Sequence, residues 1–383
     1  MNIEQFSLQE LEVVSVNAPT PLLPETVNYT YPISPKDAVI AAFEKKAVWQ
    51  TIGAETRIFT PRLLPDNIAR GFVLESKPFD PVNEGGGKDM FGIDWEYVQV
   101  AEGSMVKPGA PLLADANEWT DKLVWPDIDT WPWEDSAKAN NGTYLKPDLY
   151  NVVPIMTGWY ERLISFMDFE GAAIAMIDDE QQAAVKELFD KLSDLYIKII
   201  DKFLLYFPDI NGFQFHDDWG SQADTFFSPA CVSELIVPAM QKVTAHLHAK
   251  GLYGDLHSCG QLMKQVPNII AAGWDSWNPQ LHNDIEQIYA LYGDKLLLGA
   301  PCSYDADASK DEQRDCARAY ANRYCLPRKP TTFNTYSAHL LTPAFWEELY
   351  IQSRKCYGAK NVKLKTLGRN IGEILVADKF LDL

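Results

Sequence analysis

The chain has 383 residues, of which 46% are hydrophobic and 12% aromatic, and its formal net charge is -19. This composition is typical of a globular protein, and the length suits one large α/β barrel with an N-terminal extension. The acidity argues against nucleic acid as a partner, because phosphate recognition needs a basic surface. The six cysteines show no disulfide-scaffold spacing, which favours thiols in a reducing compartment.

The N-terminus lacks a basic segment followed by an apolar one, and no stretch approaches the length of a membrane span. We therefore expect a cytoplasmic protein without a membrane partner. Residues 1–150 are rich in proline, tryptophan and turn signals, and we expect them to form an irregular extension. This extension should pack on a catalytic domain of residues 151–383 and contribute its first strand.

From residue 152 onward short apolar runs alternate with long helical ones, the pattern of βα units around a parallel sheet. Ser228-Pro229 predicts a helix start, with a stop at Gly251 and a bend at Pro238. Ser309 with Glu312 matches a capping box, and a further helix should run from Pro343 to Gly358. The candidate strands are 152–156, 212–215, 252–256, 274–278, 295–299 and 331–335.

A histidine and a cysteine two residues apart, His257 and Cys259, follow one of these strands. Alternate residues of a strand point the same way, so the two side chains can bind one metal ion. The carboxyl end of a barrel strand is where barrel enzymes place their chemistry. The alternative is a buried structural histidine beside an inert thiol.

A second polar cluster, His216-Asp217-Asp218, follows the strand at 212–215. Two adjacent carboxylates suit proton transfer to a leaving oxygen, since one can stay protonated or orient the histidine. We predict His216, Asp217 and Asp218 as catalytic residues. The alternative is that both aspartates cap the next helix and that His216 is packed.

Five segments carry a resemblance to a known family. In chain order they are Phe215-His-Asp-Asp-Trp-Gly-Ser-Gln222, Phe227-Ser-Pro229, His257-Ser-Cys-Gly260, Gly273-Trp-Asp-Ser-Trp-Asn-Pro-Gln280 and Tyr292-Gly-Asp-Lys-Leu-Leu-Leu-Gly299. Their order resembles the uroporphyrinogen decarboxylase superfamily, and more closely its methyltransferase branch, which holds zinc through a His-x-Cys. The resemblance implies a (β/α)8 TIM barrel with its site at the carboxyl rim. It also implies methyl transfer to or from a corrinoid protein.

The chain departs from this family at two points. Where the decarboxylases carry an Arg-Gln-Ala-Gly-Arg motif, this chain reads Thr51-Ile-Gly-Ala-Glu-Thr-Arg57, so porphyrinogen decarboxylation is not expected. The third zinc ligand of the methyltransferases is a cysteine after the last strand, and residues 333–341 contain none. We expect Cys302 to replace it, with His339 or no third ligand as alternatives. A branch that has lost zinc is a further alternative.

Polar and aromatic residues after the strands are candidates for substrate binding. Amides there can hydrogen-bond an oxygen-bearing substrate, and aromatic rings can stack on a planar one, although amides also satisfy loops and aromatics commonly pack in the core. The predicted substrate-binding residues are Trp159, Tyr160, Trp219, Gln222, Asn278, Gln280 and Tyr336.

These observations favour a zinc-containing, cobalamin-dependent methyltransferase of one-carbon metabolism that demethylates a small donor such as a methoxylated aromatic. Cobalt(I) would lie on a separate corrinoid protein, because a barrel that occupies most of the chain leaves little room for a corrinoid domain. The alternative is a metal-free decarboxylase or lyase of a small carboxylated substrate, bound by Arg57, Arg62 or Arg162. A ligand-binding barrel without activity would leave the clustered titratable groups unexplained.

Overall fold

The computed structural model describes residues 5–19, 23–101, 103–305 and 307–367. The chain divides into two compact units. Unit 1 comprises residues 1–34, 38–54 and 300–383, and unit 2 comprises residues 35–37 and 55–299. These boundaries differ from the expected division after residue 150. Among the described residues, no helix is both long and apolar enough to cross a membrane.

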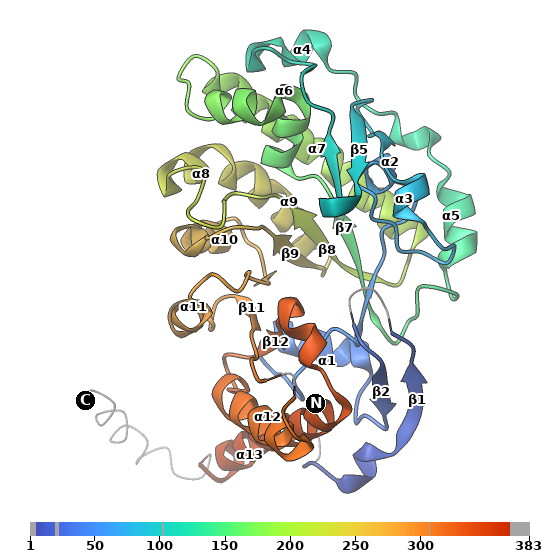
Figure 1. Cartoon of the computed structure of the whole chain (residues 1–383), viewed down its shortest axis with the longest axis vertical. Helices are drawn as coiled ribbons and strands as arrows, with labels where there is room; N and C mark the ends of the chain where they lie inside the picture. The colour runs from blue at the N-terminus through green and yellow to red at the C-terminus, as the bar shows by residue number, and fades with distance from the viewer. Residues whose placement is uncertain (1–4, 20–22, 102, 306, 368–383) are drawn as a thin grey trace. The chain divides into compact units, whose positions relative to one another are not determined.

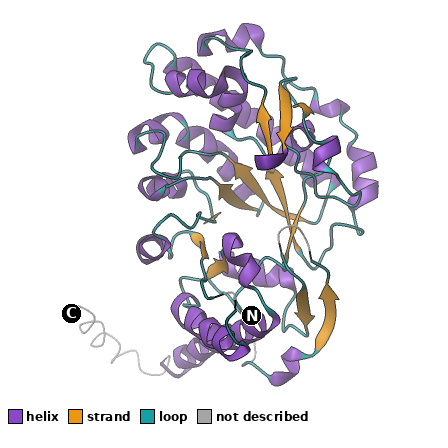
Figure 2. Cartoon of the chain, viewed as in Figure 1, coloured by secondary structure: helices purple, strands orange, loops and turns teal. Residues whose placement is uncertain are grey.

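Unit 2 is built on a strongly curled sheet of parallel strands (Figures 1 and 2). Its order is β11-β10-β9-β8-β7-β3, and every pair of neighbours is parallel. The edge strand β3 precedes residue 150 and pairs parallel with β7. The strands are β3 (Thr56–Ile58), β7 (Tyr150–Ile155), β8 (Ile210–His216), β9 (Tyr253–His257), β10 (Ser276–Trp277) and β11 (Leu297–Ala300, in unit 2 as far as Gly299).

Helices follow the strands along the chain, as the alternation of apolar runs predicts (Figure 1). Their apolar side chains pack on one face of the sheet, where the rings of Phe203 and Phe213 lie 5.9 Å apart and those of Trp159 and Phe215 5.2 Å apart. The helices are α6 (Trp159–Ala175), α7 (Gln182–Tyr206), α8 (Pro229–Leu235), α9 (Val237–Ala249), η5 (Met263–Gln265), α10 (Val266–Ala271) and α11 (Ile285–Tyr292).

The closed eight-stranded barrel expected from the resemblance is not seen, because the described strands of unit 2 form an open, half-barrel sheet. Three strands of the N-terminal region instead pair antiparallel in a separate sheet, β4 (Gly87–Lys88), β5 (Asp94–Val98) and β6 (Gly103–Val106). Short helices precede and follow these strands in the sequence. These are α2 (Pro65–Ala69), α3 (Pro81–Glu84), η2 (Gln99–Ala101), η3 (Ala116–Glu118), α4 (Trp119–Lys122), η4 (Ile128–Thr130) and α5 (Trp133–Asn140).

Unit 1 joins the two ends of the described chain around a buried aromatic core. Trp49 stacks on Tyr31 at 4.8 Å and lies against Tyr350 at 5.8 Å. Residues far apart in sequence are bonded here, since Gln50 Nε2 donates to the Thr331 carbonyl at 2.8 Å. The elements are η1 (Leu8–Leu11), β1 (Val13–Asn17), β2 (Thr26–Tyr29), most of α1 (Pro35–Phe43), α12 (Lys310–Tyr324), β12 (Thr331–Phe333), η6 (Thr335–Leu340) and α13 (Pro343–Leu367).

The predicted helix ends are confirmed at most positions. Ser228 caps α8 by accepting from the amide of Cys231, and Ser309 and Glu312 form the capping box of α12. The bend expected at Pro238 is a break between α8 and α9. The stop expected at Gly358 is wrong, because α13 continues to Leu367 and the backbone of this glycine stays out of the positive-φ region.

Candidate functional site

The candidate site lies at the carboxyl ends of β8 and β9. In β8, Phe213 and Phe215 point toward the helices, so the alternation of a strand turns Gln214 and His216 to the opposite face. His216 is paired in register with His257, the last residue of β9. The pairing brings together the two polar clusters that the sequence places after separate strands.

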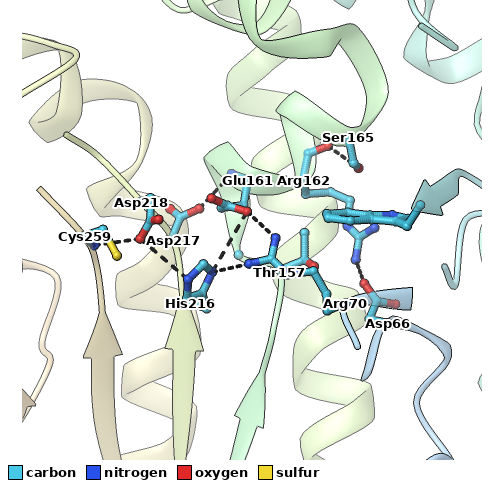
Figure 3. A network of polar contacts seen from close by, with 12 residues as sticks. Asp66, Arg70, Thr157, Glu161, Arg162, Ser165, His216, Asp217, Asp218 and Cys259 are labelled. Carbon is cyan, nitrogen blue, oxygen red and sulfur yellow. Dashed lines mark hydrogen bonds and ion pairs between the residues drawn. The ribbon is translucent and has the colours of Figure 1, made fainter. Parts of the chain in front are cut away.

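Four potential ligand atoms gather at these strand ends, and Figure 3 shows His216, Asp218 and Cys259 among them. His216, Asp218 and His257 each offer an atom within 4.8 Å of the other two, and the two imidazole rings stack at 4.6 Å. The thiol of Cys259 lies 3.4 Å from Nε2 of His257. Two atoms bound to one tetrahedral zinc, at about 2.3 Å for sulfur and about 2.0 Å for nitrogen, lie about 3.6 Å apart. The His257 and Cys259 spacing therefore fits a shared metal ion.

The electrostatics of the cluster suit a cation. Burial and the neighbouring His216 lower the pKa of His257 to about 4, so its imidazole is neutral and can act as a ligand. Burial and the charge of Asp218 raise the pKa of the Cys259 thiol, which keeps it protonated without a positive partner. A metal ion at this point would reverse that preference.

Asp217 serves the fold at this edge of the sheet. Its carboxylate accepts from the amide of Glu161 in the first turn of α6 at 2.9 Å and from Nε1 of Trp219 at 2.8 Å. Burial raises its pKa to about 8. A side chain at Gly158 would lie 2.7 Å from Cβ of Asp217, so glycine is needed where the helix meets this carboxylate. Asp217 thus caps α6, which precedes it in the chain, and its catalytic role stays a prediction.

The loop that carries Cys259 is held by two side chains. Asp218 Oδ1 accepts from the Cys259 amide at 2.7 Å. Gln280 Oε1 accepts from the Gly260 amide at 2.8 Å, and its Nε2 donates to the Cys259 sulfur at 3.4 Å. Gly260 has a φ of +104° and lies against the backbone of Gly220, where a side chain would not fit. Gln280, predicted to bind substrate, thus contacts the thiol itself.

The predicted aromatic residues near the site are core residues in this structure. Trp159, Tyr160 and Trp219 are fully buried. Trp159 Nε1 donates to Ser193 at 2.9 Å, and the Tyr160 ring packs edge-on against Phe227 at 4.9 Å. These contacts account for the three rings as packing residues, and their substrate-binding role stays a prediction.

The remaining predicted residues lie in both units. In unit 2, Gln222 is exposed in the loop after β8, and Asn278 is half-buried directly after β10. In unit 1, Cys302 donates its amide to Ser337 Oγ at 3.2 Å, and Tyr336 is half-buried in η6. Their ligand and substrate roles stay predictions. The alternative ligand His339 is exposed in the same helix.

Two residues of the site were not predicted, Arg70 and Glu161. Arg70 Nη1 donates to Glu161 Oε2 at 2.6 Å, and its Nη2 lies 3.0 Å from Nδ1 of His216 (Figure 3). Glu161 stands three residues after Gly158, at the same sheet edge as the predicted clusters. Its position beside those clusters is the sequence signal that could have identified it. Arg70 lies in the region expected to be irregular, and nothing local marks it.

Two of the three arginines proposed for a lyase pocket are already paired with carboxylates. Arg162 is fully buried between Asp66 and Asp89, and Arg62 pairs with Glu75 and Glu84. The third, Arg57, lies 5.1 Å over the ring of Tyr144. An arginine bound by two carboxylates has little capacity left for a carboxylate substrate. The alternative of a carboxylate-binding lyase gains no support from this geometry.

No model of a known protein family and no curated protein matches the chain. Its structure is similar to that of a methyltransferase from Methanosarcina mazei. The TM-score is 0.54 at 13% identity, over 84% of this chain and 98% of the other. A chitinase from Chromobacterium violaceum matches over 56% of this chain and 86% of its own at 13% identity, with a TM-score of 0.28. The similarity to the methyltransferase structure shows the fold that carries the site.

Proposed function

We propose that this chain is a zinc-assisted methyltransferase that moves a methyl group between a small donor and cobalt(I) of a separate corrinoid protein. The observation that carries the proposal is the cluster of ligand atoms at the ends of β8 and β9. The fold shared with a methyltransferase supports the same reading. A methoxylated aromatic compound is the donor class that we propose to test first.

His257 and Cys259 are the proposed zinc ligands, and Asp218 lies within reach as a third. Bound zinc would act as a Lewis acid on the oxygen or sulfur that loses or receives the methyl group. Cys302, the third ligand expected from the sequence, stays a prediction.

The residues around the ligands hold them in place. Asp218 and Gln280 bind the loop of Cys259 through its backbone and its thiol, so the sulfur faces His257. Ligand side chains fixed by neighbouring hydrogen bonds lose little freedom when they bind a metal. The proposed role of Gln280 is therefore to position the thiol.

The zinc content of the purified chain, measured by elemental mass spectrometry, tests the proposal. We expect about one zinc per chain, and a loss of that zinc in His257→Ala and Cys259→Ala. His246→Ala is the matched control, because His246 is a histidine of unit 2 that pairs with Asp201 on the surface. Added zinc should raise the melting temperature of the chain and of the control, but of neither site variant.

Methyl transfer is then measured from a methoxylated aromatic to a reduced corrinoid protein. The intact chain and His246→Ala should methylate the cobalt, and both site variants should not. A chain that binds no metal even when zinc is supplied would contradict the proposal, as would methyl transfer by His257→Ala.

A further inference from the structure

Arg70 makes a contact with His216 that restricts what this histidine can do. Nη2 of Arg70 lies 3.0 Å from Nδ1 of His216 (Figure 3). A guanidinium group carries only N–H donors, so Nδ1 has to accept this hydrogen bond with its lone pair. A neutral imidazole that accepts at Nδ1 carries its proton on Nε2.

We infer that Arg70 is a positioning residue that fixes the proton of His216 on Nε2, so that His216 is a hydrogen-bond donor beside the metal ligands and not a ligand itself. Metal binding through Nε2 would need its lone pair and would place the proton on Nδ1, facing the guanidinium. Two N–H donors would then oppose each other at 3.0 Å. The arrangement therefore disfavours ligation by His216.

The guanidinium is held independently of His216. Its Nη1 donates to Glu161 Oε2 at 2.6 Å, and only 13% of the Arg70 side chain and 14% of that of Glu161 are exposed. The guanidinium also lies 5.0 Å over the ring of Trp95. An ion pair with an aromatic face beneath it restrains the arginine from two directions. Loss of His216 would leave this arrangement intact.

A second ion pair links the same two segments, with the acid and the base exchanged between them. Arg70 directly follows α2 and Glu161 lies in the first turn of α6, while Asp66 of α2 binds Arg162 of α6. Residues 66–70 and residues 161–162 thus each give one acid and one base to the contact. Two such cross-links fix the position of Arg70 relative to α6 more firmly than one would.

The histidine on β9 is in a different setting. Nε2 of His257 faces the Cys259 thiol at 3.4 Å, whereas Nε2 of His216 faces Asp218 Oδ1 at 3.7 Å. In the proposed methyltransferase, on which this step rests, the Nε2 hydrogen of His216 would bind an acceptor atom of the substrate. The site should therefore prefer a substrate whose oxygen lies next to the transferred methyl group, as in an ether or an alcohol.

The test reads the tautomer of His216 in the zinc-free full chain labelled with 15N-histidine. Two-bond 1H–15N correlation spectra distinguish the two ring nitrogens, and His216→Gln identifies the signals. We expect a protonated Nε2 in the intact chain and a change toward the other tautomer in Arg70→Met. Arg62→Met is the matched control, because Arg62 is another ion-paired arginine of unit 2, bound to Glu75 and Glu84. A protonated Nδ1 in the intact chain, or an unchanged tautomer in Arg70→Met, would overturn the inference.

Zinc binding separates this inference from the proposed function. His216→Gln should keep about one zinc per chain, whereas His257→Gln should lose it. If zinc binds and Nε2 of His216 takes the chemical shift of a metal-bound nitrogen, the inference fails and the proposed function stands. If no zinc binds, the proposed function fails, while the tautomer in the zinc-free chain still decides the inference.

Discussion

Arg162 binds two buried carboxylates, and these two acids are held very differently. Asp66 accepts one further hydrogen bond, from the Met90 amide at 3.1 Å. Burial raises the pKa of Asp66, and the charge of Asp89 adds to this effect while Arg162 opposes it. Asp89 accepts more bonds, from the amides of Phe91 and Ile93 and from Nε1 of Trp95. One arginine neutralises only one carboxylate, so Asp66 is the one better suited to carry a proton.

This asymmetry predicts different costs for removing each charge. Asp66→Asn should lower the free energy of unfolding by less than about 1.5 kcal/mol, because a neutral group there relieves the excess charge. Asp89→Asn should lower it by about 3 kcal/mol, since an amide cannot accept every donor and leaves Arg162 uncompensated. Urea unfolding of both variants measures the difference. Equal losses in the two variants would contradict the assignment.

Single residues of the site were predictable only where a local rule applies. His257 and Cys259 stand out because the period of a strand puts residues two apart on one face. Arg70 and Glu161 lie 91 positions apart, and Arg70 and His216 lie 146 apart, so no local pattern links them. The sequence therefore indicated the proposed ligands but not the residue that orients His216.

At the scale of elements, two glycines show how the same residue type serves a helix differently. Gly158 precedes α6, and a Cβ there would meet Cβ, Cγ and Oδ1 of Asp217 at 2.7 to 2.9 Å. Gly358 lies within α13, and a Cβ there would meet no atom within 4 Å. The first glycine is required by a close approach, and the second only adds flexibility to a helix.

The two alanine variants should therefore change stability in opposite directions. Gly158→Ala should lower the free energy of unfolding by about 1 to 3 kcal/mol, because the capping carboxylate has to move. Gly358→Ala should raise it by about 0.5 to 1 kcal/mol, since alanine is the better helix former. Thermal unfolding of both variants is the measurement. A neutral Gly158→Ala or a destabilised Gly358→Ala would refute this account.

Helix starts were predicted better than helix stops. The caps at Ser228 and Ser309 are bonds within three residues, so the sequence contains both partners. A glycine with a positive φ commonly ends a helix, as Gly251 does after α9 with a φ of +74°, whereas Gly358 does not take a positive φ. Whether a glycine ends a helix or continues it depends on what lies beyond the helix.

At the scale of the whole chain, unit 1 is closed by a buried ion pair between its distant segments. Arg354 Nη2 donates to Glu10 Oε1 at 2.7 Å, and the Tyr350 hydroxyl donates to Oε2 at 2.6 Å. Burial raises the pKa of Glu10, but these hydrogen bonds and the charge of Arg354 outweigh it, so the pKa lies below its ordinary value. The ionised form is thus the one that stabilises the fold.

This direction predicts how stability depends on pH. Glu10→Gln should lower the free energy of unfolding by roughly 3 kcal/mol at pH 7, because Arg354 loses its buried partner. A lowered folded pKa contributes stability above the unfolded value of about 4.3 and loses it as the pH falls toward the folded value. The difference between the two chains should therefore shrink below about pH 4.5.

Urea unfolding at several pH values provides the measurement, with Glu12→Gln at an exposed neighbour as the control. The control should follow the intact chain throughout. A difference between Glu10→Gln and the intact chain that stays constant down to pH 3 would contradict the proposed role of Glu10.

The order of strands and helices in unit 2 was predictable because each βα unit carries its own apolar pattern. Barrel closure was not predictable in this way, because it depends on how many strands pair at the edges of the sheet. No single segment encodes that number. The antiparallel sheet of β4, β5 and β6 lies in the region expected to be irregular, where turn residues hide short strands.

The ion pair of Glu10 and Arg354 has a consequence for how the protein is made. The two residues are 344 positions apart, and ribosomes add about 5 to 20 residues per second. Glu10 therefore waits on the order of 20 to 70 seconds for its partner, while the 245 consecutive residues 55–299 of unit 2 emerge in between. Unit 2 can begin to fold during translation, but unit 1 can only be completed at the end. In a nascent chain stalled before residue 300, unit 2 should accordingly resist protease, while the residues of the aromatic core around Trp49 stay accessible to chaperones.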